Sequence, residues 1–193
     1  MKRIYSVAIL LSAFPLAAFA QQSTTPAPAP APATQLTTSP APNPVSDTLR
    51  NLIGRYSKNM IGAAESMPPD KYDYKPTPQQ ITFAHLVGHI AQSNMGLCSR
   101  ISGSPAPQTP PVADTDGKDK LVAALKASFD YCTDVLAKAD DSNLGANVGN
   151  ANRPVTKAAV MITLACDWYD HYSAQAGYLR MNGILPPSAQ PRQ

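Results

Sequence analysis

The segment DWYDHYSAQAGYLRMNGILPPS, from Asp167 to Ser188, belongs to a helix that we predict from the spacing of its apolar residues. From Val160 onward, large apolar side chains recur at steps of three and four residues, which is the period of an α-helix with one buried face. Pro154 is expected near the first turn of this helix and Gly183 at its C-cap. The apolar stripe consists of Val160, Met161, Leu164, Ala165, Trp168, Tyr172 and Leu179.

Three further stretches repeat this helical spacing. The first is expected from about Ser46, a good N-cap, to Ser66, and the second from near Gln79 to near Arg100. The third precedes the polar loop DDSNLGANVGNANRP. Because nothing alternates as a strand would, the sequence predicts an all-α four-helix bundle. The three apolar stripes are Leu49, Leu52, Ile53, Tyr56, Met60, Ala63 and Met67; Phe83, Leu86, Val87, Ile90 and Leu97; and Leu121, Val122, Leu125, Phe129, Cys132, Val135 and Leu136.

The connection between the second and third helices, Ile101 to Gly117, is long and contains SGSPAPQTPP. A tight antiparallel hairpin needs only a few residues, so this length predicts a crossover along the bundle. The second and third helices would then run parallel, which gives an up-down-down-up bundle.

The N-terminal region has the composition of an export signal followed by a spacer. Lys2 and Arg3 precede an apolar run too short to span a bilayer, and Ala18-Phe19-Ala20 forms a small-x-small cleavage site. Residues 1–20 are therefore predicted to be a signal peptide, and the Pro/Ala-rich residues 21–45 a disordered linker. The domain is expected over 46–188 and a tail over 189–193. We expect an exported protein, periplasmic or secreted, with no stable membrane insertion after signal cleavage.

The charge of the chain argues against one class of partner, and its cysteines allow two arrangements. Removing Lys2 and Arg3 from the 16 basic residues leaves 14 against 13 acidic ones, so the mature chain is nearly neutral and no nucleic-acid partner is expected. Cys98, Cys132 and Cys166 form no CxxC motif. They allow one disulfide with an odd thiol, or three small buried side chains, and the sequence leaves both open.

The only 3 histidines of the chain fall on the second and fourth predicted helices. His171 lies within the apolar stripe of the fourth helix, and Asp167 lies one turn earlier on the same side. On the second helix, His89 is expected nearer the apolar stripe than His85. Asp167 and His171 are either a hydrogen-bonded structural pair or two metal ligands completed by His89 from a facing helix.

Three separated segments carry a family resemblance: MPPDKYDYKPTPQQITFAHLVGHIAQSNMGLCSR (67–100), KASFDYC (126–132) and HYSAQAGYLRMNGILPPS (171–188). Together they resemble the DinB-like family of bacterial four-helix proteins, over about 46–188. The resemblance implies an up-down-down-up bundle that is often dimeric. It also implies a divalent metal, in many members nickel or zinc, held by one histidine of the second helix and an HxxxH pair of the fourth. Characterised relatives include thiol-dependent transferases and isomerases.

Carried over by position, the family's second-helix histidine falls on His89 and the second histidine of the HxxxH pair on His171. The first histidine of the pair falls on Asp167, which departs from the common pattern. The expected metal ligands are therefore His89, Asp167 and His171, a two-histidine, one-carboxylate set for nickel, zinc or manganese. His85 ranks below Asp167 as a substitute ligand.

These observations predict an exported metal-binding protein that acts on a small-molecule substrate, as a metal-dependent hydrolase or a thiol-dependent transferase. Export disfavours the transferase, because low-molecular-weight thiols are chiefly cytoplasmic. No residue is assigned as a catalytic acid or base. The alternative is a non-catalytic exported bundle, a binding or stress-related protein with a degenerate metal site. A homodimer is expected from the resemblance.

Overall fold

The computed structural model describes residues 41–191, and these residues form an all-α domain. Within them there is no β-strand, only two isolated bridges in the connection before the last long helix. The predicted fold class is therefore confirmed. The long helices are α1 (Pro44–Ser66), α2 (Phe83–Ser102), α3 (Lys118–Lys138) and α4 (Lys157–Met181), and two short 3-10 helices occupy Pro69–Lys71 and Pro187–Ala189.

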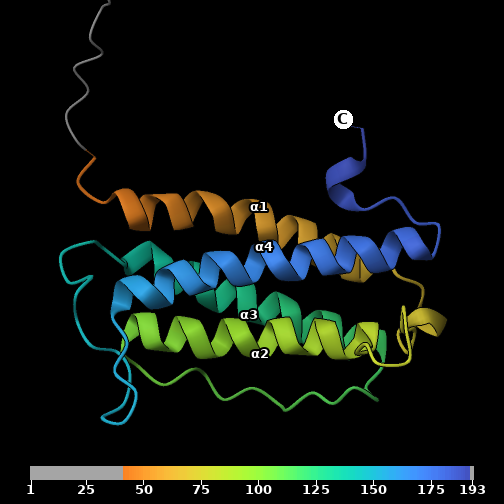
Figure 1. Ribbon diagram of the computed structural model, residues 1–193, viewed down its shortest axis with the longest axis horizontal. Coiled ribbons are helices and arrows are strands. Elements are labelled where there is room, and N and C mark those ends of the chain that lie inside the picture. Colours follow the sequence, from red (N-terminus) through yellow and green to blue (C-terminus); the bar gives the residue numbers. More distant parts are fainter. Residues whose placement is uncertain (1–40, 192–193) are drawn as a thin grey trace, which may run out of the picture. The chain divides into compact units, whose positions relative to one another are not determined.

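The order of the helices around the bundle sets which of them face each other. α1 and α2 each pack against both α3 and α4, so α1 lies diagonally across from α2. In Figure 1, α1 and α4 run in one direction and α2 and α3 in the other, and the connection between α2 and α3 runs along the bundle. This is the predicted up-down-down-up order with its crossover.

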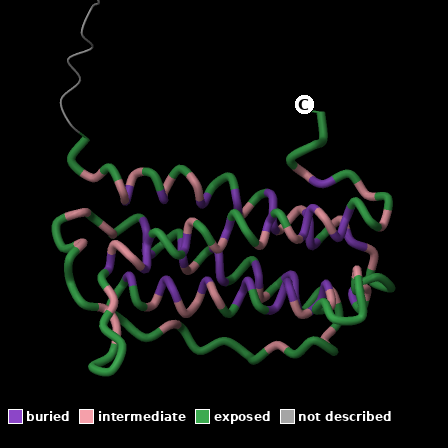
Figure 2. Tube along the Cα trace, viewed as in Figure 1, coloured by how far each residue is buried: buried purple, intermediate pink, exposed green. Residues whose placement is uncertain are grey.

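The apolar stripes meet inside the bundle, where buried segments of all four helices face one another (Figure 2). Burying one large apolar side chain stabilises the fold by roughly 1.5–3 kcal/mol, so these stripes dominate the free energy of folding. The largest side chains with almost no exposure are Trp168, Phe83, Phe129, Met60, Met67, Ile90, Leu121, Leu125, Leu136, Met161, Leu164 and Leu179.

Two helices begin later than the sequence predicts. α2 starts at Phe83 rather than near Gln79, because the hydroxyl of Thr82 caps it by accepting from the backbone N–H of His85 at 3.0 Å. α4 starts at Lys157, well after Pro154, with Thr156 as its N-cap. At the other end of α4, Asn182 is the C-cap, and Gly183, the expected cap, follows it with a φ of 72°.

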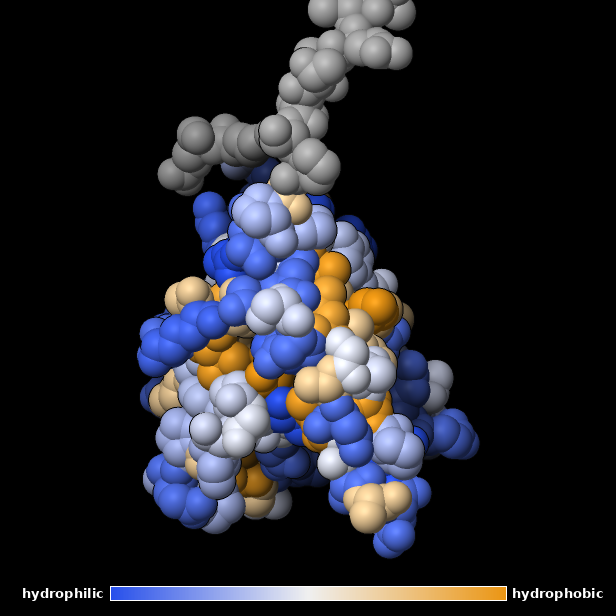
Figure 3. Space-filling view, turned by 90° about the vertical axis from the view of Figure 1, so that its left-hand side faces the viewer, coloured by the Kyte–Doolittle hydropathy of each residue, from blue (hydrophilic) through white to orange (hydrophobic). Residues whose placement is uncertain are grey.

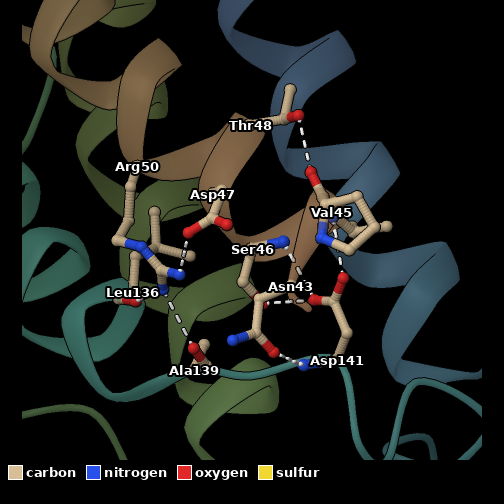
Figure 4. A network of polar contacts seen from close by, with 10 residues as sticks. Asn43, Val45, Ser46, Asp47, Thr48, Arg50, Leu136, Ala139 and Asp141 are labelled. Carbon is tan, nitrogen blue, oxygen red and sulfur yellow. Dashed lines mark hydrogen bonds and ion pairs between the residues drawn. The ribbon is translucent and has the colours of Figure 1, made fainter. Parts of the chain in front are cut away.

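Helix α1 starts earlier than expected, at Pro44, inside the predicted linker, and Figure 4 shows why. The carboxylate of Asp141 accepts hydrogen bonds from the backbone N–H groups of Val45 (2.8 Å) and Ser46 (2.9 Å) and from the Ser46 hydroxyl (2.6 Å). Arg50 in turn donates to two carbonyl groups at the C-terminal end of α3, at 2.8 and 2.9 Å. Ser46 is thus no N-cap, because a loop residue supplies the capping oxygen.

The structure tests few of the segment boundaries that the sequence predicts near the N-terminus. The predicted signal peptide, residues 1–20, and most of the predicted linker, residues 21–45, lie outside the described residues. Within residues 41–191, no helix has both the length and the apolar character that a membrane span requires.

A disulfide joins Cys98 of α2 to Cys132 of α3, with the two Cα atoms 5.4 Å apart. Cys166 on α4 is a free, exposed cysteine. Of the two arrangements that the sequence left open, one disulfide with an odd thiol is therefore the one observed. The bond ties together the two helices that the long crossover connects.

Candidate functional site

The residues predicted as metal ligands are neighbours on the seam between α2 and α4. His89 lies on α2, and its ring centroid is 4.9 Å from that of His171 on α4. One turn before His171, the Oδ2 atom of Asp167 lies 3.3 Å from His171 Nδ1. Their role as ligands stays a prediction, but the fold does bring their side chains to one place.

A buried polar contact sets the register of α2 against α4 at this point. Trp168 Nε1 donates to Asn94 Oδ1 at 2.8 Å, and Asn94 Nδ2 donates to the Ser128 hydroxyl at 3.1 Å. All three side chains are buried. Because buried polar groups need their partners, sliding either helix would break this chain of bonds. Asp167, which precedes Trp168, is thereby held against α2.

Two buried polar atoms at the site lack hydrogen-bond partners: Asp167 Oδ2 and His171 Nδ1. They are close enough for an ion pair, at 3.3 Å, but neither makes a hydrogen bond of acceptable geometry. Two ligand atoms about 2.0–2.2 Å from a tetrahedral metal ion lie about 3.3–3.6 Å apart. The separation and the chemistry of these two atoms therefore fit a divalent metal ion.

The third residue, His89, is exposed, whereas the side chains of Asp167 and His171 are only 19% and 12% exposed. Within residues 41–191, no three His, Cys, Asp or Glu side chains are already grouped so that they could hold a metal ion. The structure thus contains a preformed pair, Asp167 and His171, with the exposed His89 beside it, rather than a complete ligand set.

The relative exposure of the two α2 histidines differs from the prediction. His85 is half-buried and His89 is exposed, the reverse of what the apolar stripe indicates. The reason is the crossover: Asp114 contacts His85 Nδ1 through Oδ2 at 2.8 Å, and a Cβ on Gly88 would meet Val112 at 3.6 Å. A loop therefore covers the helix face that the helical period assigns to solvent.

Asp167 and His171 shift each other's pKa in opposite directions. Burial acts to raise the pKa of Asp167, but the side chains of His171 and Ser93 and the nearby imidazole charge outweigh it, so this pKa is lowered. The contact with Asp167 raises the pKa of His171 despite burial, which acts to lower it. Without a metal ion, the pair therefore favours a charged carboxylate beside a protonated imidazole.

We expect the contribution of His171 to the stability of the metal-free protein to depend on pH. A raised folded-state pKa adds stability that is complete below the unfolded value, about 6.5, and is lost as pH rises through the folded value. The lowered pKa of Asp167 adds stability above about pH 4 and loses it as pH falls. The window of greatest pair stability is thus about pH 4 to 6.5.

Urea denaturation of the wild type and His171→Ala, both stripped of metal, measures this effect. The difference in free energy of unfolding between the two proteins should be larger at pH 5.5 than at pH 9. His85→Ala, which removes the more exposed pair between His85 and Asp114, serves as the matched control. Equal differences at both pH values for His171→Ala would rule out the charged pair.

Sequence reasoning missed two polar residues, one at the site and one a helical turn beyond it. Ser93 lies one turn after His89 and is close enough to Asp167 to lower its pKa. Gln175 lies one turn after His171, is fully buried, and leaves its Oε1 atom without a hydrogen-bond partner. The signal was available, because both follow a predicted ligand at the four-residue spacing that keeps side chains on one helix face.

Comparison with known protein families identifies the family of this chain. The family model described as the DinB superfamily matches residues 55–171. The chain belongs to the DinB superfamily. The matched range contains His89, Asp167 and His171, so the seam between α2 and α4 is part of the family's shared region.

Solved structures share the fold of this DinB superfamily member. A DinB-like protein from Bacillus subtilis has a TM-score of 0.61 at 21% identity, with 76% of this chain and 99% of that chain covered. A DinB-like protein from Bacillus cereus has a TM-score of 0.60 at 12% identity, covering 73% and 95%. A conserved protein from Enterococcus faecalis has a TM-score of 0.54 at 16% identity, covering 70% and 95%. No curated protein matches the chain.

Proposed function

We propose that this DinB superfamily protein is exported and binds one divalent metal ion through His89, Asp167 and His171. The observation that supports it best is the pair of buried atoms, Asp167 Oδ2 and His171 Nδ1, which lack hydrogen-bond partners at 3.3 Å from each other. A bound cation would give each of these atoms the partner of good geometry that it lacks. His89 would complete the set by a side-chain rotation, which its exposure permits.

The residues themselves set how such a site would respond to pH. Because Asp167 raises the pKa of His171, a metal ion competes with a proton for the His171 imidazole over a wider pH range. Metal affinity should therefore rise with pH. Once bound, the ion would supply Lewis-acid activation of a water or a thiol at an open coordination position.

The reaction class that fits best is metal-assisted hydrolysis of a small molecule. Thiol transfer is the other class, and it fits an exported protein less well because low-molecular-weight thiols are chiefly cytoplasmic. The disulfide between Cys98 and Cys132 supports export, since such bonds persist mainly in oxidising compartments. A homodimer stays a prediction, and light scattering of the mature protein tests it.

A specific observation favours a second candidate, a non-catalytic exported bundle. Asp167 and His171 already contact each other, and residues 41–191 hold no ready group of three metal-binding side chains. In that case the two side chains would form a structural ion pair, and the protein would act by binding a partner.

Metal content separates these candidates. The protein would be expressed with its own export signal, purified without chelator or nickel affinity resin, and analysed by inductively coupled plasma mass spectrometry. We expect about one metal ion per chain, lost in His171→Ala. The matched control is His85→Ala, whose histidine contacts Asp114 instead and whose removal should leave the metal in place.

An empty protein that also fails to take up added nickel, zinc or manganese would contradict the metal proposal and leave the binding bundle. Intact-mass analysis of the same preparation tests export, because cleavage after Ala20 leaves a chain that begins at Gln21.

A further inference from the structure

A groove of about 600 Å³ lies at the end of the bundle where α2 ends and α4 begins. It is lined by Leu97 and Arg100 of α2, by part of the connection 148–155, and by Val160 and Thr163 of α4. Figure 3 looks at this end of the bundle, where apolar surface is exposed between hydrophilic parts of the molecule. Nothing proposed above uses this groove.

The groove carries positive charge and no negative charge. Arg100 and Arg153 are its only charged lining residues. Across residues 41–191, the ion pairs involve other side chains, and neither guanidinium group takes part in a side-chain hydrogen bond. Arg100 also lies near the C-terminus of α2, where a cation is favourable in any case. Arg153 lies on no helix, so the helix dipole does not account for it.

The loop that presents Arg153 is built by its own hydrogen bonds. Asn147 Oδ1 accepts from the backbone N–H groups of Gly149 and Val155, each at 3.0 Å. Asn150 Oδ1 accepts from the backbone N–H of Arg153 at 2.9 Å. Gly149 is required here, because a Cβ on it would lie 2.2 Å from the carbonyl oxygen of Arg153. A loop fixed in this way holds the backbone of Arg153 in place, so a ligand would have to order only its side chain.

Apolar side chains form the floor between the two arginines. Leu97 and Val160 are buried beneath the groove, and Val148 and Val155 are half-buried at its side. Pockets of this kind orient a ligand with a few polar groups and bind most of it through apolar contact. The lining thus suits a molecule with one anionic end and an apolar body.

The groove is lined by the same two helices, α2 and α4, that carry the candidate metal site. On α2, Ser93, Gly96 and Arg100 follow one another on one face, and on α4 Thr163 lies one turn before Asp167. A Cβ placed on Gly96 would meet nothing within 4 Å, so there is open space beside α2 at this position. Thr163 and His171 are eight positions apart on α4, which corresponds to about 12 Å along the helix axis.

We propose that this groove binds an elongated organic anion, a carboxylate on an apolar chain, with the carboxylate held by Arg100 and Arg153. The chain lies along the seam past Gly96 toward Asp167 and His171. Binding of the anion does not depend on the metal ion. Its role as the substrate of the metal site does rest on the proposed function.

Isothermal titration of metal-free and zinc-treated protein with octanoate tests the proposal, with octanol and acetate as matched probes. Octanoate should bind to both preparations and more tightly than octanol or acetate, because only octanoate has both the charge and the chain. Arg100→Gln and Arg153→Gln should each weaken octanoate binding at least about fivefold. Arg180→Gln, an exposed arginine at the other end of α4, is the matched control and should bind as the wild type does.

The direction of the chain is tested separately. Gly96→Leu fills open space and replaces a glycine inside helix α2, so it should fold with an equal or higher thermal midpoint and still weaken octanoate binding. Octanol binding as tightly as octanoate, an equal loss in Arg180→Gln, or no saturable binding would overturn the proposal. Octanoate binding by a protein that takes up no metal would keep the groove and refute only the metal site.

Discussion

Removing the Cys98–Cys132 disulfide is expected to lower the free energy of unfolding by about 3–4 kcal/mol, the largest stability loss that we predict. The two cysteines are separated by 34 positions in the sequence, and a bond closing a loop of that length removes a corresponding amount of chain entropy from the unfolded state. The loss corresponds to a fall of roughly 10 °C in Tm for a domain of this size.

Urea denaturation with and without a phosphine reductant measures the effect, and the Cys98→Ala/Cys132→Ala double variant should reproduce it. Cys166→Ser is the control, because Cys166 is exposed and unpaired, so its stability should match that of the wild type in both conditions. If reduction left the wild type unchanged, the bond would not constrain the unfolded chain as we infer.

The Cys98–Cys132 disulfide is also expected to affect the candidate metal site. Cys98 lies one turn after Asn94, the residue that sets the register of α2 against α4 through Trp168. Loosening α2 from α3 at this point should therefore weaken the positioning of Asp167 as well as the fold. Metal affinity and stability are expected to fall together on reduction.

The fold was open to prediction because helix packing depends on the spacing of apolar residues. Leu49, Ile53 and Met60 on α1 follow the helical period and are all buried, and the long crossover forces α2 and α3 to run parallel. Such features need no knowledge of which side chains meet.

Features that depend on contacts between distant segments were not predictable. The start of α1 is decided by Asp141, which follows α3, and the partial burial of His85 by Asp114 in the crossover. Likewise, the four-residue spacing predicts that Asp167 and His171 share one helix face. It does not predict the side-chain orientation that leaves the two facing atoms without hydrogen bonds. The spacing of residues along the chain identifies candidate site residues, but contacts between distant segments determine their burial and hydrogen bonding.

Replacing Asp167 by histidine is expected to raise the affinity for nickel and zinc roughly tenfold or more. The resemblance implies an HxxxH pair at this place, and an imidazole suits these metals better than a carboxylate. Asp167→His also removes the negative charge that raises the pKa of His171, so fewer protons compete with the metal at neutral pH. The side chain of Asp167 is 19% exposed, which leaves the larger ring a path toward solvent.

Competition with a chromophoric chelator at pH 7.5 would measure zinc affinity for the wild type, Asp167→His and Asp167→Asn. The asparagine variant is the matched control, since it keeps the size of Asp167 but removes its charge, and it should bind zinc more weakly than the wild type. If Asp167→Asn bound zinc as tightly as the wild type, Asp167 would not be a ligand. If Asp167→His bound no more tightly, the seam between α2 and α4 would lack the geometry of a metal site, because a third imidazole beside His89 and His171 should otherwise strengthen it.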